Sequence, residues 1–102
     1  MAKEIILYNL ADHVTDEEFK DYVNNEKGPL IESLPSVKKY TLVHITKSPT
    51  GEIPHKYIGI VDITSVKDFS QNDAQLQKYQ DFRAKFQTMV RDLQILFGEE
   101  IY

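Results

Sequence analysis

The chain has 102 residues, of which 41% are hydrophobic and 27% are charged, a size and composition typical of one folded domain. Its 16 acidic side chains outnumber the 12 basic ones, so the net charge is −4 and no basic cluster is present to attract a nucleic-acid backbone. The absence of cysteine excludes disulfides, cysteine-based metal centres and iron–sulfur clusters, so we expect a packed apolar core to supply the stability.

We expect residues 1–102 to form a single cytoplasmic domain. The N-terminal segment lacks the cationic start and apolar stretch of a signal peptide, and no apolar run approaches the roughly 20 residues that a membrane span needs. Neither a membrane nor a nucleic acid is therefore an expected partner.

The first predicted elements are a strand and a helix. The segment KEIILYNL, Lys3 to Leu10, is apolar without clean alternation, which is typical of a strand covered on both faces. Thr15 and Glu18 have the spacing of a capping box and predict a helix that begins directly after Thr15. Because proline lacks an amide hydrogen and disfavours helix for the residue before it, Gly28-Pro29 predicts a break or kink, at the mouth of any pocket.

A hairpin is predicted next. Its strands run from about Val37 to Thr46 and from His55 to Thr64, and the turn chemistry of Ser48-Pro49-Thr50-Gly51 separates them. The second of these strands is too continuously apolar for a sheet that is open to water on one side.

The C-terminal third predicts helical segments and a last strand. Ser65 should cap a short helical turn through Phe69, and an apolar stripe with steps of three or four predicts a helix from about Asp73 to Asp92. QILFGEEIY then reads as a strand, with Gly98 as a candidate bulge.

The order β-α-β-β-α-β predicts a ferredoxin-like α+β fold, a four-stranded antiparallel sheet with both helices on one face. No sequence remains to cover the other face. The simplest way to cover this face is to pack it against the same sheet of a second chain, so we predict a homodimer in which two chains pack face to face.

The stretches IILYNL, FKDYV, the proline-to-LPSV segment, KYIGIVDIT and LFGEEI resemble the REDY-like proteins, the HapK type of dimeric α/β barrel. The resemblance covers nearly the whole chain. It implies a cavity between sheet and helices and a link to pyrrole-type secondary metabolites. Similar ferredoxin-like proteins include cofactor-free monooxygenases, cyclases and haem-degrading enzymes. The stretch that gives the family its name corresponds here to NEKGP, where Glu26 and Pro29 fit the pattern and Lys27 and Gly28 depart from it.

His44 is the foremost candidate for chemistry. Strand alternation places it on one face with Tyr40 and Leu42, and places Val43 and Ile45 on the other. If Val43 and Ile45 face the helices, His44 faces a cavity or the dimer seam; in the reverse case it faces the helices. A cavity histidine could act as a general base, whereas a structural one needs only a hydrogen-bond partner, and both interpretations stay open.

Other strand residues are candidates for lining a ligand pocket. Asn9 is a buried amide that needs partners, and a ligand could be one of them. Gly59 leaves space midway along its strand, either for a ligand or for tight packing. Tyr40 and Tyr57 could donate hydrogen bonds to a carbonyl, or they could simply pack.

Metal and haem chemistry are disfavoured, and we expect no cofactor. The three histidines lack metal-ligand spacing. The chain has no tryptophan, and no histidine lies between Ser65 and Asp92, which argues against haem degradation. Glu26 and Asp62 could pair as acid and base, although a solvated position suits each of them better.

Two functions remain open. One is a protein that binds or transforms a small aromatic or heterocyclic metabolite in a cavity between sheet and helices. The other is a non-catalytic homodimeric accessory module. The acidic balance disfavours an RNA-binding ferredoxin-like domain. The sequence leaves open whether the protein is an enzyme.

Overall fold

All four predicted strands form, and they make one antiparallel sheet. They are β1 (Ala2–Leu10), β2 (Val37–His44), β3 (Tyr57–Ile63) and β4 (Val90–Glu99). Their order across the sheet is β2-β3-β1-β4. The computed structural model describes residues 1–102, and this strand order is that of the predicted ferredoxin-like fold.

The N-terminal helical stretch runs without a break. It consists of α1 (Asp16–Tyr22), a π-helical turn η1 (Val23–Lys27) and α2 (Gly28–Glu32). Thr15 caps the stretch as predicted, because its Oγ accepts the amide hydrogen of Glu18 at 3.1 Å. The predicted break at Gly28-Pro29 is wrong, since Gly28 keeps helical backbone angles of φ −60° and ψ −55°.

A π-helical turn takes the place of the predicted break. The Gly28 amide donates to the carbonyl of Val23, five residues earlier, so the helix widens just before Pro29. The wider turn avoids the clash that a proline ring makes with the carbonyl four residues earlier in an α-helix. Glycine is needed here because a Cβ on Gly28 would lie 2.9 Å from the Val23 oxygen. Lys27, the last residue of the turn, lies in the interior with 2% of its surface exposed.

The C-terminal helical segments begin as predicted, but the first runs past Phe69 to Gln71 and the second is shorter than expected. Ser65 caps α3 (Val66–Gln71) by accepting the amide hydrogen of Asp68 at 2.9 Å. The helix expected over residues 73–92 is divided into a 3-10 turn, η2 (Asp73–Gln75), and α4 (Gln77–Met89). The division occurs because Leu76 is extended, and the helix ends early because the chain enters β4 at Val90.

The irregularity of the β1–β4 pair lies at Asp92 rather than at Gly98, and a second register shift, between Val37 and Lys39, lies in the β2–β3 pair. The register of β1 against β4 shifts between Leu7 and Asn9, where Asp92 takes a left-handed φ of 57°. Gly98 pairs with Lys3 in regular register, so the bulge predicted at this glycine is wrong.

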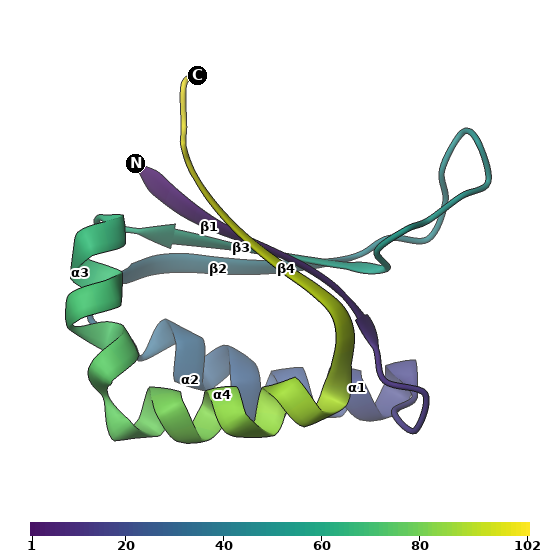
Figure 1. Ribbon diagram of the computed structural model, residues 1–102, viewed down its shortest axis with the longest axis horizontal. Helices are drawn as coiled ribbons and strands as arrows, with labels where there is room; N and C mark the ends of the chain where they lie inside the picture. The colour runs from purple at the N-terminus through teal and green to yellow at the C-terminus, as the bar shows by residue number, and fades with distance from the viewer.

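One face of the sheet packs on the helices and the other is uncovered. Figure 1 shows the strands crossing on one side of α1, α2 and α4, with no helix on the opposite side. In β3 the helix-side residues are buried, whereas Ile58 and Ile60 on the opposite face are only half-buried. The core beneath the sheet has one cluster that includes Val61 and Ile63 and another around Tyr8. No helix has the length and apolar content to span a membrane.

Candidate functional site

A cavity of about 540 Å³ lies between α1 and the adjoining ends of β2 and β3, and we call it the His44 cavity. Its strand side is formed by Leu42, His44 and Tyr57. Its helical wall is formed by Asp16, Glu17, Phe19, Lys20, Val23 and Asn24. The volume falls within the roughly 300–1,000 Å³ that is usual for small-molecule sites.

His44 faces the helices, and the cavity lies on that same side of the sheet. Leu42 packs into the aromatic core cluster, so strand alternation directs His44 toward α1 as well. His44 is opposite Tyr57 in the register of β2 and β3, and the two rings stack with centroids 4.6 Å apart and planes 5° apart. Of the two orientations that the sequence left open, His44 has the one that faces the helices, and the cavity lies on this side of the sheet.

A carboxylate from α1 adds to the polar part of the His44 cavity, which also includes Glu17, Lys20 and Asn24. The Tyr57 hydroxyl donates a hydrogen bond of 2.7 Å to Oδ1 of Asp16, in the first turn of α1. Burial, together with this bond, raises the pKa of the Tyr57 phenol, so the phenol keeps its proton. Imidazole, phenol and carboxylate therefore meet at one side of a cavity whose remaining strand and helix walls include the apolar Leu42 and Phe19.

A second and smaller cavity, of about 70 Å³, lies between the centre of the sheet and α4, and we call it the Lys27 chamber. Its lining is Glu4, Ile6, Lys27, Ile31, Tyr40, Val61, Tyr79, Phe82, Arg83, Phe86, Gln87, Leu93 and Ile95. The two cavities share no lining residue. Tyr40 thus lies apart from the His44 cavity, and its hydroxyl accepts a hydrogen bond from Nζ of Lys27.

Gly59 lies beneath the Tyr40 ring. A Cβ on Gly59 would be 3.7 Å from Cε1 of Tyr40, which is an ordinary contact distance. A tyrosine ring therefore covers Gly59, which corresponds to the tight packing considered from the sequence rather than to space for a ligand.

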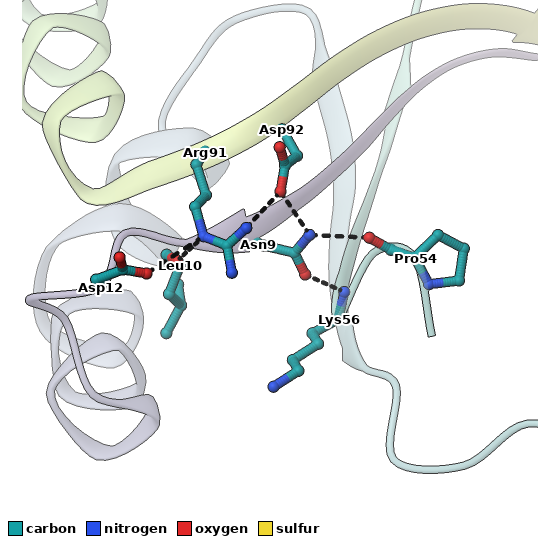
Figure 2. Close-up of polar contacts among 7 residues, drawn as sticks. All are labelled: Asn9, Leu10, Asp12, Pro54, Lys56, Arg91 and Asp92. Atoms are coloured by element: carbon teal, nitrogen blue, oxygen red, sulfur yellow. Dashed lines mark hydrogen bonds and ion pairs between the residues drawn. The ribbon is translucent and has the colours of Figure 1, made fainter. Parts of the chain in front are cut away.

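Asn9 is the centre of a hydrogen-bond network that ties three segments together (Figure 2). Its amide nitrogen donates to the carbonyl of Pro54 at 2.8 Å and to Oδ2 of Asp92 at 3.0 Å, and its oxygen accepts the Lys56 amide hydrogen at 2.9 Å. Arg91 reaches the same Asp92 oxygen. Because protein groups bind both amide hydrogens and the oxygen, Asn9 fastens the β2–β3 loop to β1 and to the bulge. Asn9 does not line the His44 cavity, but it lines a neighbouring cavity of about 330 Å³ that also includes Asp16.

Glu26 and Asp62 do not meet. Glu26 is exposed on η1 and forms an ion pair of 2.9 Å with Lys85 of α4. Asp62 pairs with Lys3 on the uncovered face of the sheet. Glu26 therefore has the solvated position that the sequence offered as the alternative to acid–base chemistry, whereas Asp62 is half-buried beside its partner Lys3.

Lys27, Glu4 and Asp16 were not among the candidate site residues proposed from the sequence. Helical spacing of four residues puts Lys27 on the stripe of Val23 and Ile31, and strand alternation puts Glu4 on the same face as the buried Ala2. A charged residue on an otherwise apolar stripe is therefore the signal that could have identified Lys27 and Glu4. Asp16 follows the helix cap, where an acidic residue is expected for the helix dipole alone, so nothing local distinguished it.

Comparison with known proteins gives one family and a set of similar folds. A family model described as REDY-like protein HapK matches residues 2–101. HapK from Hahella chejuensis superposes with a TM-score of 0.82 at 22% identity, over 99% of this chain and 93% of HapK. None of the curated protein sequences compared is detectably similar to the chain.

Two further solved structures have the same fold. A dimeric ferredoxin-like protein of unknown function from Thermobifida fusca has a TM-score of 0.76 at 15% identity, over 97% of this chain and 90% of its own. A hydroxynitrile lyase from Passiflora edulis has a TM-score of 0.82 at 13% identity, over 99% of this chain and 95% of its own. At these identities the similarity concerns the fold alone.

Proposed function

Because the chain belongs to the REDY-like HapK family, we propose that it is a cytoplasmic, homodimeric protein that binds a small aromatic or heterocyclic metabolite in the His44 cavity. The observation that carries this proposal is the convergence of His44, Tyr57 and Asp16 at one side of a cavity of about 540 Å³. Ligand sites typically combine an apolar lining with a few convergent polar groups, and this cavity has that composition.

The cavity suits a flat molecule with a polar edge. The exposed ring of His44, backed by Tyr57, offers an aromatic surface on which a planar ligand can stack. Asp16 lies beside it and can accept a hydrogen bond from a ring N–H or from a phenol, while also holding the Tyr57 hydroxyl. Pyrrole-type and phenolic compounds have both features.

Proton transfer is the reaction that this group of residues supports. An imidazole can remove a proton from a phenol or from an acidic carbon, and a phenol donor such as Tyr57 can stabilise the negative oxygen that forms. Tyr57 would have to exchange its bond to Asp16 for one to the ligand.

The alternative function is a non-catalytic homodimeric module. It is favoured by the fact that the Tyr57 hydroxyl and the His44 ring already have partners within the chain. In this case the polar residues of the cavity only stabilise the contact between α1 and the sheet.

A binding screen on variants separates the two functions. Indole, pyrrole-2-carboxylate and simple phenols would be titrated while ligand-induced shifts of the amide NMR signals are followed. We expect saturable shifts at residues of the His44 cavity, a loss of affinity of at least about tenfold in His44→Ala, and little change in melting temperature because His44 is exposed.

His13→Ala is the matched control, since His13 is an exposed histidine outside the cavity. The binding function is contradicted if no compound perturbs the cavity, or if His44→Ala lowers the melting temperature strongly without a change in affinity.

A further inference from the structure

Lys27 is held in an interior site without a carboxylate partner. Its Nζ lies 4.3 Å from the ring centroid of Tyr40, 5.1 Å from that of Phe86 and 5.8 Å from that of Phe82. Its one hydrogen-bond partner is the Tyr40 hydroxyl. Lysine is rarely this buried unless an acid neutralises it, so its position calls for an explanation.

Glu4 is a second interior group that faces the same chamber. It is 5% exposed and lines the Lys27 chamber, yet its carboxyl group forms no hydrogen bond or ion pair with the protein. An amine and a carboxyl group therefore share a cavity of about 70 Å³ without touching each other. The rest of the lining is mostly aromatic and aliphatic.

Burial moves both groups toward their neutral forms. Burial lowers the pKa of Lys27 to about 7, although the charge of Glu4 opposes this shift. Burial likewise raises the pKa of Glu4 to about 7, although the charge of Lys27 opposes that shift. The other titratable groups that line the chamber are Tyr40 from β2 and Tyr79 and Arg83 from α4. Burial raises the pKa of both tyrosines, so near pH 7 the chamber holds neutral phenols, one arginine and a substantial fraction of free lysine amine.

We propose that the Lys27 chamber is a carbonyl-binding site in which Nζ of Lys27 forms an imine with a short-chain aldehyde or ketone. A desolvated lysine amine is the usual nucleophile for this reaction. The small volume restricts the ligand to a few non-hydrogen atoms, and the aliphatic and aromatic lining suits an alkyl chain. This site is separate from the His44 cavity and goes beyond the function proposed for it.

The chamber contains the groups that each step requires. The free amine attacks the carbonyl carbon, and the carbonyl oxygen takes up a proton while the nitrogen loses one, giving a carbinolamine. Glu4, as the carboxylic acid, then protonates the hydroxyl group, which leaves as water as the C=N bond forms. The Glu4 carboxylate takes the remaining proton from the nitrogen, so the balance is amine plus carbonyl compound giving imine plus water.

Tyr40 positions the amine and can bind the ligand oxygen. Its oxygen accepts the hydrogen bond from Nζ of Lys27, so its own phenol hydrogen is available to a carbonyl oxygen in the chamber. The chamber opens between α4 and β4, where Arg83 and Gln87 are exposed and Leu93 and Ile95 are 37% and 45% exposed.

The test is site-resolved reductive amination. The protein is treated at pH 7 with limiting propanal and sodium cyanoborohydride, and peptide mapping by mass spectrometry measures the rate of propylation at each lysine. About half of an amine with a pKa of 7 is free at this pH, against roughly one in 2,500 for an ordinary lysine. We expect Lys27 to react at least about tenfold faster than the mean of the other lysines, even with restricted access.

Variants separate this site from a merely accessible lysine. Glu4→Gln should slow propylation of Lys27 about tenfold and leave the other lysines unchanged. Lys38→Met, at an exposed lysine of β2, and His44→Ala should both leave the Lys27 rate unchanged, so the outcome is independent of the His44 cavity. The proposal is overturned if wild-type Lys27 reacts no faster than the exposed lysines, or if Glu4→Gln has no effect on its rate.

Discussion

Lys27 and Glu4 are the residues whose burial opposes folding most clearly. They are 2% and 5% exposed, and no ion pair joins them, so their attraction only partly offsets the loss of hydration. Tyr8 adds a buried hydroxyl group that has no hydrogen-bond partner in the protein. Unfavourable groups of this kind are commonly kept where a function requires them, which is consistent with the role proposed for the Lys27 chamber.

Replacing Lys27 by methionine should stabilise the protein near neutral pH. The pKa of Lys27 falls from 10.5 in the unfolded chain to about 7 in the folded protein. The stability that the neutral form contributes is therefore fully present above about pH 10.5 and is lost as the pH falls toward 7. Lys27→Met removes this loss. We expect its free energy of unfolding in urea to exceed that of the wild type by about 1–3 kcal/mol at pH 7, and by much less at pH 10.

Glu4 gives the opposite dependence, and because the Lys27 charge lowers its pKa, Lys27→Met should raise the pKa of Glu4 further. Its raised pKa contributes stability below about pH 4.5 that is lost as the pH rises to about 7, so the comparison is best made at pH 7 and above. Lys38→Met, at an exposed lysine, should show no such difference. A Lys27→Met protein that is less stable than the wild type at pH 7 would mean that the bond to Tyr40 and the aromatic contacts outweigh desolvation.

At the scale of elements, the π-helical turn η1 determines what the N-terminal helix presents to the sheet. It allows the helix to pass Pro29 without a break and ends at the interior Lys27. π-helical turns within α-helices occur frequently at functional sites, and this one lies at the wall of the Lys27 chamber. The turn depends on the close approach of Gly28 to the Val23 carbonyl.

A methyl group on Gly28 should disturb this turn. The added Cβ would lie 2.9 Å from a backbone oxygen, which cannot move without shifting the helix. We expect Gly28→Ala to lower the free energy of unfolding by about 1–3 kcal/mol, measured by urea unfolding at pH 7. In the control Gly98→Ala the new Cβ has no atom within 4 Å, so stability should stay the same or rise slightly. Equal effects of the two substitutions would show that the Val23 contact does not matter.

Local signals predicted most of the elements. The caps at Thr15 and Ser65 depend on hydrogen bonds within one turn, and the strands are recognisable as short apolar runs. The fold and the family resemblance could therefore be recognised from the sequence, and both are confirmed. The break at Pro29 was wrong because the proline rule assumes α-helical geometry, and a π-helical turn satisfies the same constraint. The bulge at Asp92 depends on pairing with β1, which a single segment does not reveal.

The candidate site was less predictable than the fold. His44 and Tyr57 could be proposed one by one, but their stacking follows from the register of β2 on β3, and Asp16 joins them through the docking of α1. The interior position of Lys27 follows from the π-helical turn. Each of these relations is tertiary, so residue type and spacing alone do not specify it.

At the scale of the whole molecule, the uncovered face of the sheet is the feature that one chain leaves incomplete. Its centre is formed by Ile5, Leu7, Ile58 and Ile60, which the strand register places side by side and which are half-buried, with Val43 and Leu96 at 41% and 44% exposure beside them. No helix lies over this face (Figure 1). A continuous apolar face of this kind is usually an interface.

A charge at the centre of this face should separate the two chains of the proposed homodimer. Ile60 lies between Ile5 and Thr41 in the sheet, so a lysine there would place an ammonium group in the contact between the two sheets. We expect the wild type to sediment at twice 11.9 kDa at micromolar concentration and Ile60→Lys to sediment at 11.9 kDa. Gln80→Lys, which adds the same charge to an exposed position on α4, should remain dimeric. A wild-type monomer that unfolds cooperatively would contradict the face-to-face arrangement, because this face would then be stable in water without a second copy.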